Sequence, residues 1–377
     1  MTQVRLAVDI GGTFTDVVLE RDGLHHGAKV LTTPDNPADA FMTGVRQVLT
    51  ETGTEPAQIA LIIHGTTLAT NALIERKGAR TALVVTQGHR DSLEMAYENR
   101  FDQYDINAER RPPLVPRELR LPVVERVDFL GEILTPLEES SVEALVPILR
   151  DADVQAVAIG LLHSYANPGH ERRIAEILRD GLPGLSITLS SEVCPEIREY
   201  ERQSTACANA YVQPLMARYL EDVRTRLSKA GFGCPCLMMT SGGHLVTIPT
   251  AQSFPVRLLE SGPAGGAILA ANIARSLGED QVVSFDMGGT TAKICLIDDG
   301  EPMLNRGFEV DRAHRFMKGS GMPVKIPVVE MVEIGAGGGS IASVDSLGRI
   351  QVGPHSAGAA PGPACYGLGG ERPTVTD

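Results

Sequence analysis

Short runs of apolar residues, several of them alternating with polar ones, mark the first part of the chain as a series of strands. They lie at 4–10, 14–20, 28–32, 60–64 and 81–86. Apolar residues at a helical period, with Asn36 as N-cap and Pro37 in the first turn, predict a helix that ends near residue 52. A shorter helix is predicted at 70–77. The order βββαβαβ favours a mixed sheet covered on both faces.

Helices and strands continue to alternate through the rest of the chain. A segment at 95–136, rich in Arg, Glu and Pro, interrupts them and is expected to be an insertion that projects from the core. The elements predicted after it are helices at 138–150, 168–182, 199–230 and 265–277, and strands at 154–162, 186–191 and 236–240. At 377 residues the chain is long enough for two domains, and we expect lobes at 1–190 and 191–377.

One strand–turn–strand segment occurs twice, and its two copies are 277 residues apart. Residues 6–23 read LAVDIGGTFTDVVLERDG and residues 283–300 read VSFDMGGTTAKICLIDDG, with seven of 18 aligned positions identical. Either copy alone is compatible with an ordinary hairpin turn. Two matched copies, one in each lobe, instead predict two hairpins that face across a cleft and hold the phosphates of one nucleotide.

The residue types in the two turns suit phosphate. Glycine has no Cβ, so successive backbone N–H groups can point together at phosphate oxygens, and threonine hydroxyls add donors. The residues expected to do so are Gly11, Gly12, Thr13, Gly288, Gly289 and Thr290. Asp9 and Asp286 stand at the strand ends, where a carboxylate can hold hydrated Mg²⁺ or orient the attacking group. Asp16 corresponds to Lys293, so the two hairpins differ chemically.

Composition narrows the class of protein. Hydrophobic residues make up 43% and charged residues 21%, as in ordinary globular proteins. A net charge of −13 disfavours nucleic acid and anionic membrane surfaces as partners, since both are bound by basic patches. Of six cysteines only Cys234 and Cys236 are close, without the spacing common in zinc sites, which favours reduced thiols. We find no signal peptide or membrane-spanning run and expect a cytoplasmic protein.

Several other motifs are each open to two interpretations. The HGTT motif at 64–67 stands where a strand ends and a helix begins, where α/β sheets bind ligands, but a threonine there can simply cap the helix. The charged segment 195–202 can line a cleft or only form salt bridges on a helix. The segments 260–266 and 335–340 can wrap a nucleotide or make tight turns, and the latter lacks the Lys-Ser/Thr of a P-loop.

Seven motifs together carry a family resemblance. They are DIGGTFTD (9–16), HGTTLATNALIERKGA (64–79), EIREYERQSTACANAY (196–211), ESGPAGG (260–266), DMGGTTAK (286–293), IGAGGGSIA (334–342) and SAGAAPGPACYGLGG (356–370). In this order they resemble the hydantoinase A/5-oxoprolinase family of the actin/hexokinase/heat-shock-chaperone ATPase superfamily. The resemblance implies an α/β fold of duplicated actin/hexokinase-like (ribonuclease H-like) βββαβα lobes. Because members of the family are longer, it also implies that the second lobe is incomplete here.

The resemblance implies ATP-dependent opening of a cyclic amide, such as a hydantoin, an N-methylhydantoin or 5-oxoproline, by phosphorylation of the amide oxygen. ATP and Mg²⁺ are the implied cofactors, and a B-type hydantoinase subunit is the implied partner in a hetero-oligomer. The catalytic residues expected are Asp9, Asp286, His64, Glu199 and Arg202, with Asp9 and Asp286 also as metal ligands. The residues expected to bind the nucleotide are Gly11, Gly12, Thr13, Thr15, Asp16, Gly288, Gly289, Thr290, Thr291, Lys293, Thr66, Thr67, Gly337 and Gly338.

Three alternatives remain open from the sequence. A related branch of the family carboxylates ketones such as acetone or acetophenone, and bicarbonate-dependent ATP turnover would identify it. A sugar or acetate kinase shares the two hairpins but not the HGTT or PGPACYG segments. A nucleotide-gated chaperone or filament protein of the same superfamily would turn over ATP without a small-molecule substrate.

Overall fold

The computed structural model describes residues 4–33, 35–100, 102–289, 291–312, 317–358 and 361–377. The chain forms two compact units. Unit 1 holds the residues up to Glu260 together with Arg306–Pro327, and unit 2 holds Ser261–Asn305 and Val328–Asp377. The units are therefore divided after Glu260, whereas the lobes expected from the sequence meet at residue 190.

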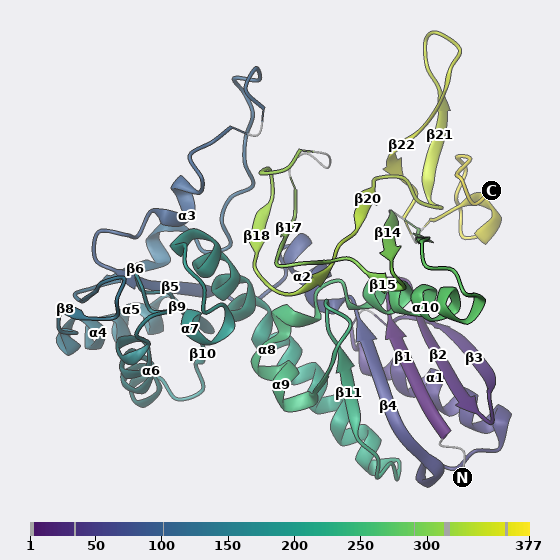
Figure 1. Ribbon diagram of the computed structural model, residues 1–377, viewed down its shortest axis with the longest axis horizontal. Helices are drawn as coiled ribbons and strands as arrows, with labels where there is room; N and C mark the ends of the chain where they lie inside the picture. The colour runs from purple at the N-terminus through teal and green to yellow at the C-terminus, as the bar shows by residue number, and fades with distance from the viewer. Residues whose placement is uncertain (1–3, 34, 101, 290, 313–316, 359–360) are drawn as a thin grey trace. The chain divides into compact units, whose positions relative to one another are not determined.

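The first sheet of unit 1 contains the first hairpin (Figure 1). Its strands run in the order β12-β11-β4-β1-β2-β3. Strands β1, β4 and β11 are parallel to one another, and the remaining pairs are antiparallel. The strands are β1 (Val4–Ile10), β2 (Phe14–Arg21), β3 (Leu24–Leu31), β4 (Ile59–Thr66), β11 (Cys236–Met239) and β12 (Leu245–Thr247). This mixed sheet is the one that the first strands of the sequence predict.

Helix α1 (Pro37–Thr52) covers one face of this sheet, and its ends follow from the sequence. The Asn36 side chain accepts a hydrogen bond from the Ala38 N–H, and Gly53 ends the helix in the left-handed conformation. A Cβ on Gly44 would come 2.6 Å from Val17 Cγ2, so glycine lets α1 lie close to β2. Each fully buried side chain of the apolar face, such as Phe41, stabilises the fold by roughly 1.5–3 kcal/mol.

A second sheet of unit 1 is entirely parallel, in the order β10-β9-β5-β6. Its strands are β5 (Thr81–Thr86), β6 (Arg120–Val123), β9 (Ala156–Ile159) and β10 (Ser186–Leu189). From the sequence, β5 was expected in the first sheet, but it belongs to this second sheet. Residues 95–136 were expected to project from the core as an insertion, but they supply strand β6 of this sheet. All residues of β5 and β9 are buried, as expected for a parallel sheet covered on both faces.

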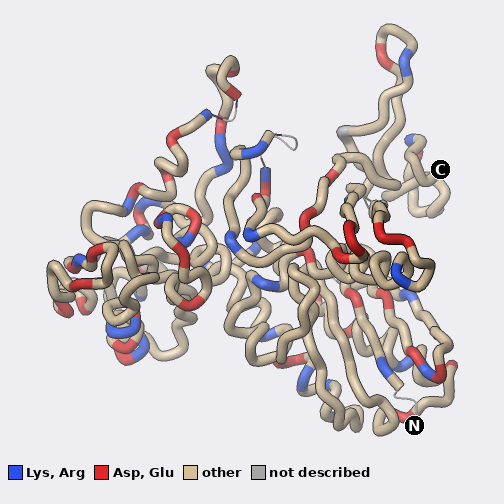
Figure 2. The backbone as a smooth tube through the Cα atoms, in the orientation of Figure 1, with Lys and Arg blue, Asp and Glu red and all other residues tan. Residues whose placement is uncertain are grey.

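Helices α4 (Glu139–Glu143), α5 (Leu145–Asp151) and α6 (Gly169–Gly181) belong to this part of unit 1. The sequence predicts one helix over 138–150, but the structure breaks it at Ala144. Pro147 has no N–H with which to continue the hydrogen-bond ladder of α4, which accounts for the break. On α6, acidic and basic residues are interspersed (Figure 2), and Arg173 forms ion pairs with Glu139 and Glu176.

Helix α8 (Glu199–Lys229) connects the two sheets of unit 1 because it packs on β9 and β10 and also on α1 and α2 (Leu68–Ile74). The other helices of unit 1 are α3 (Ser92–Met95), α7 (Ser190–Val193) and α9 (Ile248–Ser253). Its other strands are β7 (Arg126–Val127), β8 (Ile133–Thr135), β17 (Phe308–Val310) and β18 (Met322–Val324). Short 3₁₀ turns lie at Pro56–Gln58, Arg117–Leu119 and Pro255–Leu258.

Unit 2 is built around the second hairpin. Helix α10 (Ser261–Leu277) packs on β13 and β14, over a small core that includes Ala264, Ala267, Cys295 and Val329. Its strands are β13 (Val282–Met287), β14 (Ala292–Asp298), β15 (Glu301–Pro302), β16 (Leu304–Asn305), β19 (Val328–Val329), β20 (Val332–Ile334), β21 (Ser340–Val344) and β22 (Ile350–Ser356), followed by a 3₁₀ turn at Ala364–Tyr366. Strand β20 pairs with β14, so it extends the hairpin to a third strand.

Candidate functional site

The two hairpins predicted from the repeated sequence have the same strand register. In the first, Arg5 pairs with Glu20 and Asp9 with Asp16. In the second, Val282 pairs with Ile297 and Asp286 with Lys293, which are the same positions 277 residues later. The repeated sequence therefore forms a repeated structure, pair by pair.

The turns of the two hairpins are closed by the same hydrogen bond. The Gly11 N–H donates to the Phe14 carbonyl at 2.9 Å, and the Gly288 N–H donates to the Thr291 carbonyl at 2.9 Å. Within the described chain, the N–H groups of Gly12, Thr13 and Gly289 donate no hydrogen bond. The first glycine of each pair thus shapes the turn, and the residues after it present the amides that an anion can use.

Asp9 stands at the edge of the first turn and lies against Gly65 of the neighbouring parallel strand. A Cβ on Gly65 would come 2.8 Å from Oδ1 of Asp9, so only glycine leaves room for this carboxylate. A Cβ on Gly12 would lie 3.5 Å from Nδ2 of Asn71, so the Asn71 amide also reaches the turn. The first turn, the end of β4 and the start of α2 form one local cluster.

Thr66 and Thr67 join this cluster through the backbone. The Thr67 N–H and hydroxyl both donate to the Ile10 carbonyl, at 2.9 and 3.2 Å. The Thr66 hydroxyl accepts from the Leu68 N–H at 3.2 Å, and the Thr67 hydroxyl accepts from Nδ2 of Asn71 at 3.3 Å. In these contacts the two threonines hold the β4–α2 junction against β1, and nucleotide binding by them stays a prediction.

Thr15 and Asp16 lie on opposite faces of β2. The Thr15 side chain is fully buried, and its hydroxyl lies 3.0 Å from that of Thr32, which donates to the Gly11 carbonyl at 2.9 Å. These contacts connect β2 and the residue after β3 to the backbone of the first turn. The Asp16 carboxylate forms an ion pair with Lys29 on β3 at 2.6 Å, with both side chains about half exposed.

The second turn is supported by the glycine-rich segment that precedes β21. The N–H groups of Gly338 and Gly339 donate to the carbonyls of Gly288 and Gly289, at 2.9 and 2.7 Å. A Cβ on Gly339 would come 3.0 Å from the Gly289 carbonyl oxygen, so the approach requires glycine. Gly337 is buried beside them, and its N–H donates to the Ser340 hydroxyl at 2.9 Å. Thr290 lies outside the described residues.

Across the three strands of unit 2, Lys293 stands between Asp286 on β13 and Glu333 on β20. Burial lowers the pKa of Lys293, and the charge of Glu333 raises it. Across the strands of unit 1, the corresponding row is Asp9, Asp16 and Lys29. The middle position is therefore basic in one unit and acidic in the other.

The residues at the two turns suit Mg²⁺. Carboxylate oxygens are hard ligands, and Mg²⁺ is usually bound by one or two carboxylates together with water and substrate phosphates. Each turn offers one aspartate, and among the described residues no group of three or more His, Cys, Asp or Glu is arranged to hold a metal. Asp9 and Asp286 are thus candidate ligands for a phosphate-bound ion.

His64 is buried in the core beneath the first sheet. Its Nδ1 donates to the Val8 carbonyl at 3.0 Å, so Nε2 accepts from the Tyr219 hydroxyl at 2.6 Å. The ring also meets Phe41 edge-on, with centroids 5.1 Å apart. Burial lowers the pKa of His64 to about 4, although the hydrogen bond to Val8 raises it. This environment favours a structural role for His64 over the catalytic one expected from the sequence.

We expect His64 to make the fold sensitive to mild acid. Its pKa is lowered on folding from 6.5 to about 4, so between these values the unfolded chain binds a proton that the folded chain does not, and stability falls as the pH falls. Between pH 7 and pH 5 this amounts to about 2 kcal/mol. Urea unfolding at both pH values should show that His64→Gln removes this loss. Equal losses in the wild type and the variant would contradict the assignment.

Glu199 and Arg202 begin helix α8. Arg202 is 1% exposed and donates to the carbonyls of Glu196 and Leu161, both at 2.8 Å. Its guanidinium also lies over the Tyr165 ring, 5.4 Å from the centroid. Glu199 is half-buried in the first turn of the helix. These contacts tie α8 to the second sheet, and they favour a structural role for Arg202.

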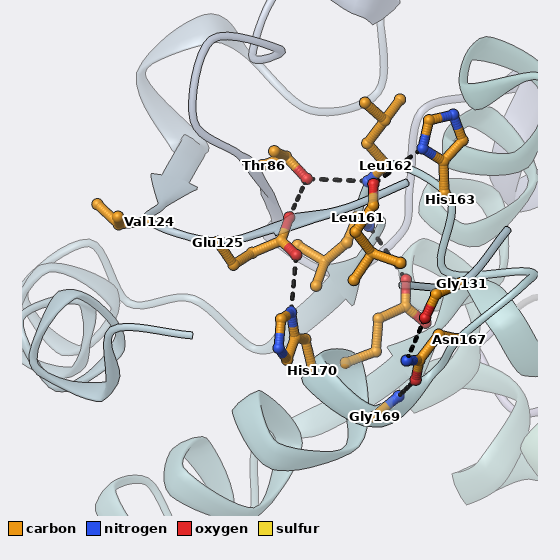
Figure 3. A network of polar contacts seen from close by, with 12 residues as sticks. Thr86, Val124, Glu125, Gly131, Leu161, Leu162, His163, Asn167, Gly169 and His170 are labelled. Carbon is orange, nitrogen blue, oxygen red and sulfur yellow. Dashed lines mark hydrogen bonds and ion pairs between the residues drawn. The ribbon is translucent and has the colours of Figure 1, made fainter. Parts of the chain in front are cut away.

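A polar network that the sequence did not reveal lies at the carboxyl ends of the second sheet's strands. Figure 3 shows Glu125 between Thr86 and His170: its carboxylate accepts from the Thr86 hydroxyl and from Nδ1 of His170, the latter at 2.8 Å. Glu171 is fully buried nearby. Its two oxygens accept four hydrogen bonds, from the N–H groups of Leu161 and Ser191 and the hydroxyls of Ser190 and Ser191, at 2.6–3.1 Å.

Three residues of the first cluster are not among the catalytic and nucleotide-binding residues expected from the sequence: Gly65, Thr32 and Asn71. Gly65 and Asn71 are part of the HGTTLATN segment, so the motif itself was the available signal. Thr32 has no motif, and its contact with the turn depends on the pairing of β2 with β3. Only the sheet register could have shown it.

Taken together, the mixed sheets and duplicated hairpins are those of the actin/hexokinase-like α/β class. The chain belongs to the hydantoinase/oxoprolinase family: residues 5–182 match the family's N-terminal region and residues 202–377 match its hydantoinase/oxoprolinase domain. It is 38% identical over 382 residues to caprolactamase subunit alpha of Pseudomonas jessenii, covering 100% of this chain and 54% of that protein. It is 33% identical over 417 residues to 5-oxoprolinase of Saccharomyces cerevisiae, covering 99% of this chain and 31% of that protein.

Solved structures agree with this assignment. The ATP-dependent caprolactamase from Pseudomonas jessenii matches with a TM-score of 0.84 at 38% identity, over 99% of this chain and 54% of that one. Nucleotide-free acetone carboxylase matches with a TM-score of 0.83 at 28% identity, over 100% of this chain and 54% of that one. The chain thus spans about half the length of these relatives.

Among the described residues, no helix is both long and apolar enough to cross a membrane.

Proposed function

We propose that this chain binds ATP with Mg²⁺ and uses it to activate the amide oxygen of a small cyclic amide for ring opening. The observation that carries the proposal is the pair of hairpins, each closed by the same glycine hydrogen bond and each presenting an aspartate beside at least one amide that donates no hydrogen bond within the described residues. The relatives described as ATP-dependent enzymes support the nucleotide.

In this proposal the turns do the binding. The N–H groups of Gly12, Thr13 and Gly289 donate to phosphate oxygens, and Asp9 and Asp286 hold Mg²⁺ and its water. When bound, ATP supplies the γ-phosphoryl group that opens the amide carbon to attack by water. Most of the catalysis in such a transfer is positioning and charge neutralisation, for which preformed turns are suited. That both turns hold a single nucleotide stays a prediction.

The partner is also part of the proposal. The caprolactamase relative is an alpha subunit, and the chain covers about half of that subunit. We therefore propose that it works in a hetero-oligomer with a B-type hydantoinase subunit, which completes the hydrolysis.

The test is a substrate panel, in which the chain with its B-type partner is given Mg·ATP and hydantoin, N-methylhydantoin or 5-oxoproline. We expect one of these cyclic amides to raise phosphate release at least tenfold, with one ring opened for each ATP consumed. The same rate of phosphate release with and without each of these cyclic amides would contradict the proposal.

A second candidate is the ATP-using subunit of a ketone carboxylase. It is favoured by the match to acetone carboxylase, whose TM-score of 0.83 is almost that of caprolactamase at 0.84. The same assay separates the two, because a carboxylase would need bicarbonate together with acetone or acetophenone and would leave hydantoins intact.

A further inference from the structure

A pocket of about 480 Å³ lies in unit 1, and no residue of the first turn is among those that line it. All twelve residues that line it belong to this unit. Its walls include the apolar side chains of Val193, Val246 and Ile326, and Thr240 stands at one edge, directly after strand β11. Ligand sites of small molecules have volumes of roughly 300–1,000 Å³, so this pocket can hold one.

Sheet register places this pocket beside the first turn. Strand β11 pairs in parallel with β4, and β4 with β1, such that Met238, His64 and Val8 stand in one row. Thr240 follows β11 directly, and two more residues in the same register would bring it level with Ile10, the residue before the first turn. Adjacent strands are about 4.8 Å apart, so the end of β11 and the end of β1 are separated by about 10 Å. Ligands of open α/β sheets bind at this carboxyl edge.

The charges around the pocket are mostly positive. Arg257, Arg306 and Lys325 line it, against one carboxylate, that of Glu196. Lys325 Nζ lies 3.2 Å from a Glu196 oxygen, so that pair is neutralised. Arg257 adds a further cationic side chain to a largely apolar wall, and such a wall strengthens its attraction for an anion.

Arg257 is held in place without being neutralised. Its carbonyl accepts from both the N–H and the hydroxyl of Ser241, each at 2.8 Å. Its guanidinium lies over the Phe254 ring, 4.7 Å from the centroid. In the part of the chain that the structure describes, Arg257 forms no ion pair with a carboxylate. A fixed, planar guanidinium at a pocket wall is the group that proteins use to bind carboxylates.

From this we infer that the pocket binds the anionic group of the substrate, a carboxylate, with Arg257 as its principal partner and the apolar walls around the carbon skeleton. The inference rests on the proposed function and deepens it, because it selects cyclic amides that carry a negative charge over neutral ones. A carbonate ion presents the same chemistry, so bicarbonate is the second source of anion to be separated by experiment.

The test compares two molecules that differ only in the carboxylate. Binding of 5-oxoproline and of 2-pyrrolidinone to the wild-type protein is measured by calorimetry without nucleotide, with bicarbonate as a third ligand. We expect 5-oxoproline to bind at least tenfold more tightly than 2-pyrrolidinone. Equal binding of the two rings, or no binding of either anion, would overturn the inference. Binding of bicarbonate but of neither ring would overturn the selection of charged cyclic amides and would assign the anion site to carbonate.

Variants then locate the site. Arg257→Gln should weaken anion binding about tenfold, and Lys325→Gln should weaken it as well, because Glu196 then loses its ion pair and repels the anion. Arg46→Gln, at an exposed residue of α1, should leave anion binding unchanged. Loss of binding in all three, or in none, would contradict the assignment of the pocket. Because no nucleotide is present, these measurements stand even if the chain fails to turn over ATP, so the two proposals can fail separately.

Discussion

Asp9→Asn is expected to lower ATP turnover about 100-fold while leaving the fold intact. The amide keeps the size of the carboxylate beside Gly65 but cannot carry the charge that holds Mg²⁺ and orients the attacking group. Losses of this size are typical when one preorganised charged or polar group is removed from a reaction centre. Phosphate release under saturating Mg·ATP measures the rate, and thermal unfolding verifies the fold.

A carboxylate on the same strand pair provides the control. Glu20 pairs with Arg5 across β1 and β2, at the end of the hairpin away from the turn, and their ion pair is partly exposed. Glu20→Gln should therefore leave the rate within about twofold and cost well under 1 kcal/mol of stability. If Asp9→Asn retained full turnover, or if Glu20→Gln were equally inactive, the first turn would not be the phosphate site.

Glu171→Gln is expected to lower the free energy of unfolding by about 3 kcal/mol. Either oxygen of this buried carboxylate accepts from one backbone N–H and one serine hydroxyl. Whichever oxygen the NH₂ group of glutamine replaces, it faces a backbone N–H, which can only donate a hydrogen bond. One buried donor therefore loses its acceptor, and the negative charge of the carboxylate is lost as well. Urea unfolding at neutral pH measures the difference.

The matched control lies on the same helix. Glu176 is exposed and forms an ion pair with Arg173, three residues before it. Such surface pairs contribute little, so Glu176→Gln should change stability by less than about 0.5 kcal/mol. Equal effects of the two substitutions would show that the Glu171 network does not hold the second sheet to α6 and α7.

The sequence was sufficient to predict where several strands and helices begin or end. Strand β1 runs from Val4 to Ile10 and strand β5 from Thr81 to Thr86, as their apolar patterns predict, and α1 ends at Thr52. These elements carry their own signals: alternation, an N-cap asparagine and a glycine after the last turn. The repeat also predicted the matching of the two turns, because identical Gly-Gly-Thr triplets impose the same backbone constraints.

What the sequence could not supply was the direction in which polar side chains face. His64 and Thr66 both belong to the HGTT motif, yet His64 contacts Tyr219, a residue 155 positions away. Arg202 lies in a charged segment that looks solvent-exposed, but it is buried against Leu161. Each of these outcomes depends on the long-range packing of α8, for which no local pattern exists.

The division of strands between two sheets was beyond the sequence for a similar reason. Strand β5 follows β4 and α2 closely in the chain, which favours a single sheet. Its all-buried pattern is equally suited to a separate parallel sheet, and its partners, β6 and β9, come from later in the chain. Partner choice is a property of the whole fold, not of the strand itself.

Asp16 and Lys293 occupy the same position of the two hairpins but carry opposite charges, so the hairpins differ in the charge next to the turn. In unit 1 the strand after the turn carries the Asp16 carboxylate, which forms an ion pair with Lys29 on the next strand. In unit 2 the equivalent strand carries Lys293, whose pKa is lowered by burial. The two copies of one sequence pattern therefore differ in the charge beside the turn, and we expect the turn of unit 2 to bind an anion more readily than the turn of unit 1.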